Sequence, residues 1–197
     1  MKDTAQSILD VTEDMIRQGG YLGFSFRNIA DTVGIKSSSV HYHFETKEKL
    51  GAATTKRYTE NFISSLGSPE QLALDGINPV AHYISAFRNA IISDKGMCLC
   101  GVLGTEAYAL PETIVAELNN FFDENARWLE RAYKQIGVTE DVKEQALHTL
   151  SLLEGAMIVS TTKRDLSVCL TKRLKSSLKK LVLKDAICEH RQAIEAN

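Results

Sequence analysis

The fold is decided by residues 25–47, which read SFRNIADTVGIKSSSVHYHFETK. Apolar residues recur here at three- and four-residue steps, which predicts one short helix over Phe26–Val33 and a second over Ser37–Phe44. Ser25 is a suitable N-cap for the first helix, because its hydroxyl can accept a hydrogen bond from a free backbone amide. Gly34 stands where the chain must turn sharply, and glycine pays no Cβ penalty there. Two short helices joined by such a turn are typical of the helix-turn-helix that enters the DNA major groove.

The second short helix has an apolar side and a polar side. At 100° per residue, Val40 and Phe44 share one side. That side is expected to pack against the apolar residues of the preceding helix and turn: Ile29, Val33 and Ile35. Hydroxyls and rings occupy the opposite side and its flanks: Ser38, Ser39, His41 and Tyr42. Such groups can bond bases or phosphates and contact thymine methyls, whereas His43 lies nearer the apolar side.

Positive charge gathers around this helix, although the net charge of the chain is −2. Between Lys36 and Arg57 there are five Lys or Arg residues and two Glu residues. The distribution of charge decides binding to a polyanion more than the total does. Thr46 is expected to cap a further helix whose free amides attract a phosphate, and Lys47 adds charge there. The alternative is an ordinary helical bundle with polar residues outside.

The rest of the chain also predicts helices. Only 3 prolines and 7% aromatic residues, with long runs lacking glycine or proline, favour an all-α fold. Periodicity and end signals place the other helices at 4–18, 47–62, 79–93, 98–108, 111–136, 142–162 and 170–194. Residues 64–78 are rich in Gly, Ser and Pro and are expected to separate two regions.

Four segments together resemble the TetR family of bacterial transcriptional repressors: Gly23–Ala30, Val33–Ile35, Val40–Phe44 and Lys47–Leu50. The resemblance implies a three-helix helix-turn-helix DNA-binding domain over residues 1–50. It also implies a larger helical domain over residues 51–197 that binds a small molecule and dimerises through its last two helices. The chain departs from the family pattern at His41, where a tyrosine is most usual.

The same resemblance suggests which residues contact DNA. Ser25 and Arg27 are expected at the DNA backbone or a neighbouring base, and Lys47 at a phosphate. Together with the exposed and positive residues noted above, the predicted DNA-binding set is Ser25, Arg27, Lys36, Ser37, Ser38, Ser39, His41, Tyr42, His43, Thr46 and Lys47. The expected partner is a palindromic operator in double-stranded DNA, because the two DNA-binding domains of a dimer meet successive major grooves.

An apolar or aromatic effector is expected between the middle helices of the larger domain. The predicted ligand-binding residues are Tyr83, Phe87, Cys98, Cys100, Glu106, Tyr108, Trp128 and Met157. Each of them is alternatively a plain core residue. Cys98 and Cys100 allow three interpretations: a thiol sensor, a metal site with His82, or two small buried hydrophobic residues. On one helix the two thiols would point ~200° apart.

A dimer interface is predicted from the last two helices. Leu152–Val159 is apolar over too many consecutive positions for a one-sided surface helix, and leucines recur at steps of four and three at positions 170, 174, 178 and 181. Two such helices from each chain form a four-helix interface, and the alternative is burial within one chain. The last helix is basic on its outside, which indicates a solvated exterior or a second anionic surface.

Other classes of function find little support. No Gly-rich phosphate loop, nucleophile elbow, His-Glu-x-x-His or paired-cysteine zinc spacing is present, so we expect no enzyme, no cofactor and no metal. No apolar run approaches the ~20 residues of a membrane span, and no signal peptide is visible. The four cysteines fit a reducing cytoplasm. We therefore expect a ligand-released repressor; the alternative is a helical protein-binding module without specific DNA binding.

Overall fold

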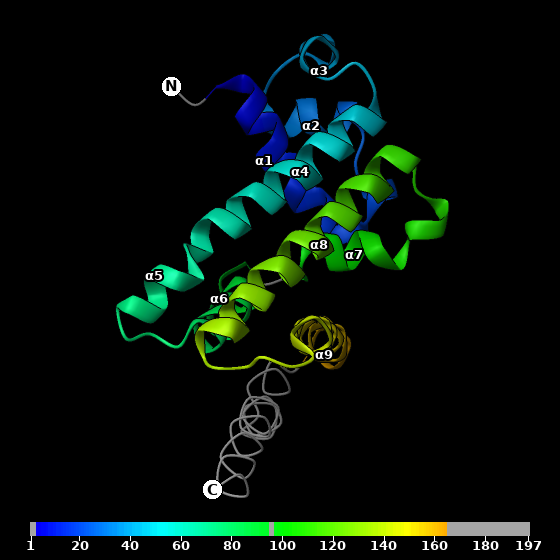
Figure 1. Cartoon of the computed structure of the whole chain (residues 1–197). Coiled ribbons are helices and arrows are strands. Elements are labelled where there is room, and N and C mark those ends of the chain that lie inside the picture. The colour runs from blue at the N-terminus through cyan, green and yellow to red at the C-terminus, as the bar shows by residue number, and fades with distance from the viewer. Residues whose placement is uncertain (1–2, 95–96, 165–197) are drawn as a thin grey trace, which may run out of the picture. The chain divides into compact units, whose positions relative to one another are not determined.

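The computed structural model describes residues 3–94 and 97–164, and within these residues it contains helices and no strands. Figure 1 shows the elements in chain order. Their bounds are α1 Thr4–Gly19, η1 Tyr21–Gly23, α2 Phe26–Val33, α3 Ser37–His43, α4 Lys47–Leu66, α5 Pro69–Leu74, α6 Pro79–Asp94, α7 Leu99–Thr105, η2 Ala107–Ala109, α8 Glu112–Gln135 and α9 Val142–Lys163. The predicted all-α class is confirmed. The expected helix over 170–194, with its leucine stripe and basic face, lies outside the described residues.

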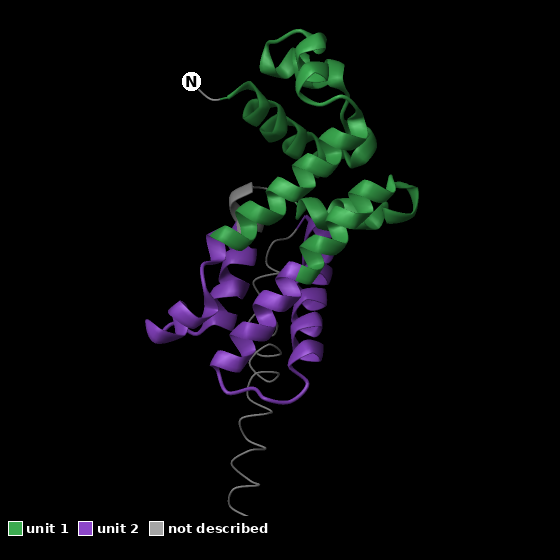
Figure 2. Cartoon of the chain, turned by 45° about the horizontal axis from the view of Figure 1, so that its top comes forward, with its two compact units in different colours: residues 1–64, 96–123 green, residues 65–95, 124–197 purple. Residues whose placement is uncertain are grey.

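The chain divides into two compact units, coloured separately in Figure 2. Unit 1 consists of residues 1–64 and 96–123, and unit 2 of residues 65–95 and 124–197. The first boundary falls inside the segment 64–78, where a separation was expected. The two units are the parts of the chain that pack most densely within themselves. The predicted functional division, with a DNA-binding domain ending at residue 50, stays a prediction.

Two segments differ in detail from their sequence-based expectations. Within 64–78 the chain forms the short helix α5, because Ser68 accepts a hydrogen bond from the Gln71 amide and Pro69 stands in the first turn. The single helix expected over 98–108 is divided into α7 and η2. Glu106 ends α7 with backbone angles of φ −104° and ψ 4°, and the chain then makes a 3-10 turn.

The N-terminal part of unit 1 is called the reading head here and comprises α1, η1, α2, α3 and the first turn of α4. Its centre is apolar: Ile8, Ile16, Ile29, Val40 and Leu50 are fully buried. The expectation that Val40 faces the core is therefore confirmed, and Val33, Ile35 and Phe44 are half-buried around it. The reading head thus has its own core beneath α3.

Arg57 of α4 joins that helix to α1 by two ion pairs. Its guanidinium lies 2.7 Å from the Asp10 carboxylate and 3.0 Å from that of Glu13, and its side chain is only 13% exposed. Burial raises the pKa of Glu13 above its usual 4.5 and outweighs the opposing effects of Arg57 and Arg17. The folded protein therefore holds this carboxylate at a desolvation cost.

The raised pKa of Glu13 predicts how the stability of the protein changes with pH. Because the folded-state value exceeds the unfolded one, the favourable contribution of this group is complete below pH 4.5 and is lost as pH rises through the folded pKa. We expect wild type to gain stability relative to Glu13→Gln when the pH is lowered from 7 to 4.5, measured by urea denaturation of both proteins. A relative loss on acidification would contradict this assignment. Arg57→Met should enlarge the shift, since it removes the main opposing charge.

Unit 2 has a core of aromatic side chains with two buried polar pairs. Tyr83 of α6 lies 6.1 Å from Phe87 and 5.5 Å from Trp128 of α8, measured between ring centroids. The Tyr83 hydroxyl donates to the fully buried Asn125 at 2.7 Å. The hydroxyls of Tyr133 and Thr149 lie 2.6 Å apart and join α8 to α9. None of the described helices is long and apolar enough to cross a membrane.

Candidate nucleic-acid interface

The helix α3 presents its polar side to solvent. Tyr42 is 85% exposed, and most of the remaining polar side chains are also exposed: Ser37, Ser38, His41 and His43. Ser39 is half-buried. No side chain caps the N-terminus of α3 at Lys36. The helix therefore carries an open polar face directly above the buried Val40.

Rings fix the orientation of part of this face. His41 packs edge-on against Phe26 of α2 at 4.4 Å between ring centroids, and Tyr42 lies against His43 at 5.3 Å. The expectation that His43 lies towards the core is wrong, because its side chain is exposed. The reason is that α3 ends at His43: Phe44 is already extended, so no further turn covers the histidine.

Caps and a glycine turn hold the two helices in place. Ser25 accepts a hydrogen bond from the Asn28 amide at 3.2 Å and donates to the Asn28 side chain at 2.8 Å. Gly34 adopts the left-handed conformation with φ 79°, which strains any residue with a Cβ. Thr46 accepts from the Lys49 amide at 3.1 Å. These expectations are confirmed, and the Ser25 hydroxyl is already engaged within the protein.

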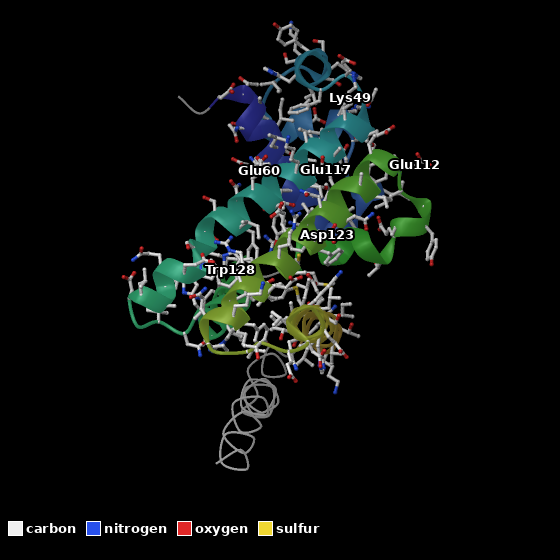
Figure 3. The ribbon with its side chains drawn as sticks, in the orientation of Figure 1. Lys49, Glu60, Glu112, Glu117, Asp123 and Trp128 are labelled. Atoms are coloured by element: carbon white, nitrogen blue, oxygen red, sulfur yellow. The ribbon has the colours of Figure 1, made fainter. Side chains whose placement is uncertain are left out.

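The first turn of α4 carries two lysines in different surroundings. Lys49 is exposed at the start of the helix (Figure 3) and forms an ion pair with Glu45. Lys47 is half-buried, and its ammonium lies 4.7 Å from the ring centroid of Tyr21 and 4.6 Å from that of Phe24. Burial lowers the pKa of Lys47, and the charge of Glu106 partly opposes that effect. The sequence pattern did not indicate this aromatic site for Lys47.

The eight predicted ligand-binding residues do not form one group within either unit. Unit 2 brings Tyr83, Phe87 and Trp128 together in its core, where Met157 is also buried. The other four belong to unit 1: Cys98, Cys100, Glu106 and Tyr108. Tyr108 is fully exposed, and Glu106 accepts a hydrogen bond from the backbone amide of Tyr21 at 2.9 Å.

The two cysteines of unit 1 are buried beside Tyr58 of α4. The expectation that their thiols diverge is wrong, because Cys98 precedes α7 as its N-cap and is not part of the helix. Its sulfur is hydrogen-bonded to the Cys100 thiol, the Tyr58 hydroxyl and the amides of Cys100 and Gly101. Burial raises the pKa of Cys98, but these hydrogen bonds prevail and lower it to about 6.

Two residues near the predicted ligand set escaped the sequence analysis. Tyr58 carried no signal, since its partners lie forty residues later in the chain. Asn125 carried one: it falls on the apolar stripe of α8 between Leu118 and Leu129, where a polar side chain needs an internal partner. Across the described part of the chain, no group of three His, Cys, Asp or Glu side chains is arranged to hold a metal ion.

A short exposed helix held by a capped helix and a left-handed glycine turn defines a helix-turn-helix protein of the DNA-binding class. Residues 8–54 match the family described as bacterial regulatory proteins, tetR family. Similar solved structures span nearly the whole chain. A TetR transcriptional regulator from Legionella pneumophila is 26% identical, with a TM-score of 0.81, and the match covers 91% of this chain and 97% of that one.

Two further solved structures share the fold. A TetR-family transcriptional regulator from Agrobacterium tumefaciens is 24% identical with a TM-score of 0.74, covering 92% of this chain and 96% of that one. A regulatory protein TetR from Rhodobacter sphaeroides is 21% identical with a TM-score of 0.74, covering 90% and 96%. No curated protein sequence matches the chain. Residues 8–54 thus match the DNA-binding region of the TetR family, and the chain shares the fold of TetR-family transcriptional regulators over about nine-tenths of its length.

Proposed function

We propose that this DNA-binding regulator is a homodimeric repressor that occupies a palindromic operator until a small-molecule effector releases it. The observation that carries the proposal is the open polar face of α3, fixed above a buried core by Val40 and by the packing of His41 on Phe26. A protein with this function binds DNA and an effector, and it needs no catalytic group. Because its target is DNA, we place it in the cytoplasm.

The proposed DNA contacts fall into two groups. Those on α3 enter the major groove and read bases or grip its edges: Ser37, Ser38, Ser39, His41, Tyr42 and His43. Those at the flanking helix ends and turn meet the phosphate backbone: Ser25, Arg27, Lys36, Thr46 and Lys47. Helix N-termini and lysines attract phosphates without regard to sequence, so the first group supplies specificity and the second supplies affinity.

The proposed dimer rests on α9 and the segment that follows it. Leu147 and Ile158 of α9 are 45% and 41% exposed. They are eleven residues apart, so they share a face of the helix within about 20°. An apolar face of this kind fits a second copy of the chain, as DNA with two-fold symmetry requires.

The proposed effector class is an electrophile that reacts with Cys98. The hydrogen bonds from Tyr58 and Cys100 support it, because they favour the nucleophilic thiolate. In the probe reaction the Cys98 sulfur bonds to one alkene carbon of N-ethylmaleimide, and the other alkene carbon takes a proton. Because Cys98 is buried, the added group is expected to displace α7.

We expect N-ethylmaleimide to reduce duplex binding by wild type and to leave binding by Cys98→Ser unchanged. Mass spectrometry of the treated protein should locate the adduct on Cys98. Cys100→Ser serves as the control, since its hydroxyl can still donate to the Cys98 sulfur. An equal loss of binding in Cys98→Ser would remove Cys98 from the response.

The repressor proposal is tested first by selecting bound sequences from random duplex DNA at low salt. Enrichment of a two-fold palindrome with half-sites roughly one helical turn apart, ~34–36 Å, is the expected result. A single enriched half-site would contradict the dimer. No enrichment by folded protein would favour a helical protein-binding module instead.

A further inference from the structure

The segment 97–113 is fastened to the reading head at several points, all within unit 1. At its start, Arg17 of α1 donates to the Met97 carbonyl at 3.0 Å. At its end, Thr113 donates to the Glu48 carboxylate of α4 at 2.6 Å. Between them, Glu106 accepts from the Tyr21 amide. Of these three contacts, only the one at Glu106 reaches the turn between α1 and α2.

Glu106 lies directly on that turn. Gly20 has φ +68°, and a Cβ added to it would stand 2.0 Å from Oε1 of Glu106. The other carboxylate oxygen, Oε2, holds the Tyr21 amide at 2.9 Å. The backbone conformation at position 20 favours glycine, and a Cβ there would displace the Glu106 carboxylate from the turn. The carboxylate and the turn fit each other closely.

The same carboxylate acts on Lys47. Tyr21 and Phe24, packed edge to face at 5.7 Å, both lie under the Lys47 ammonium. The negative charge of Glu106 stabilises this ammonium against its partial burial. The Glu106 side chain thus contacts the α1–α2 turn and acts by its charge on Lys47. Lys47 is the first residue of α4, at the helix N-terminus where a phosphate is expected to bind.

Glu106 is firmly tied to α7. It is the C-terminal cap of that helix, and its backbone amide bonds to the Leu103 carbonyl at 3.0 Å. A displacement of α7 therefore carries the Glu106 carboxylate with it. Because α7 begins at the Cys98 cluster, the helix links that buried cluster to the reading head over seven residues.

We propose that Glu106 is the positioning residue through which α7 sets the α1–α2 turn and orients Lys47 for the operator phosphate. The proposal rests on the DNA-binding function proposed above and specifies how that function is regulated. Coupling between two sites is reciprocal: if α7 controls DNA affinity through Glu106, DNA binding must also alter α7 through Glu106.

Two substitutions separate the two actions of the carboxylate. Glu106→Gln keeps an oxygen for the Tyr21 amide and removes the charge that faces Lys47, whereas Glu106→Ala removes both. Glu112→Gln and Glu112→Ala are matched controls, because Glu112 is an exposed carboxylate at the start of α8 (Figure 3). Each control removes one negative charge, as the corresponding substitution at Glu106 does. All variants are full-length chains, and each is checked for unchanged unfolding before binding is measured.

Affinity for the selected duplex is measured by fluorescence anisotropy over a range of salt concentrations. We expect Glu106→Ala to bind about tenfold more weakly than the Glu112 controls, since a charge-assisted hydrogen bond is lost. Glu106→Gln should lose about threefold in affinity. In both variants the slope of log affinity against log salt should fall by about one per reading head, because one phosphate contact is lost.

Hydrogen exchange in α7 gives the second readout. DNA is expected to change the exchange of the amides of residues 99–105 in wild type, and this change should disappear in Glu106→Ala. A purely structural role would lower stability and leave the response of α7 to DNA intact. The proposal is overturned if Glu106→Ala binds DNA like the controls, or if its α7 amides still respond to DNA as in wild type. A wild type that binds no duplex would instead overturn the proposed function.

Discussion

Replacing Tyr42 by alanine is expected to weaken binding to the selected duplex by about tenfold or more, a loss of ~1–3 kcal/mol. Tyr42 is 85% exposed on the open face of α3, so its ring and hydroxyl can meet the groove. The same exposure means that little packing is lost in the free protein. The free energy of unfolding should therefore stay within ~0.5 kcal/mol of wild type.

Tyr108→Ala is the matched control for this prediction. It removes the same side chain from a fully exposed position in η2, outside the reading head. Anisotropy titrations of both variants with the palindromic duplex and with an unrelated duplex separate specific from general binding. Equal affinities for the two variants would show that Tyr42 does not contribute to DNA binding. A Tyr42→Ala variant that loses the same factor in affinity for both duplexes would place Tyr42 on the phosphate backbone.

Truncating Ile29 to alanine is expected to lower the free energy of unfolding by ~2–5 kcal/mol. Ile29 of α2 is fully buried, and α2 packs against both α1 and α3. Loss of its side chain leaves a cavity in a small core that has few other apolar groups to fill it. Operator binding should fall with stability, since the orientation of α3 depends on this core.

Leu22→Ala is the control, because Leu22 belongs to the same reading head and is 86% exposed. Urea denaturation followed by circular dichroism should give a change within ~0.5 kcal/mol for this variant. Ile29→Val should lie between the two, with a loss of ~0.5–1.5 kcal/mol. Similar unfolding for Ile29→Ala and Leu22→Ala would contradict the packing of α2 described above.

Local signals in the sequence predicted the reading head well. Ser25 and Gly34 mark the limits of α2 because capping and left-handed turns depend on one residue and its neighbours. The long α8 helix followed from its apolar stripe. The start of α4 after Thr46 followed from the cap. In each case the deciding interaction lies within about one helical turn.

The contacts of Lys47 and Cys98 could not be found in this way. Lys47 feels the charge of Glu106, fifty-nine residues later, and Cys98 is hydrogen-bonded to Tyr58, forty residues earlier. Periodicity assigns a residue to a face of its own helix and does not identify the residue opposite it. His43 shows a related limit, because a helical wheel assumes a helix that continues past the residue in question.

The shortness of α3 has an evolutionary consequence. Seven residues are too few to form a stable helix alone, so its shape is imposed by the surrounding reading head. Val40 and the Phe26–His41 contact hold α3 in its helical shape. The exposed side chains at positions 38 and 42 therefore contribute little to folding. New DNA-sequence preferences can therefore arise by exchange of these exposed side chains in a few mutational steps, each tolerated by the fold, while the rest of the chain is inherited unchanged.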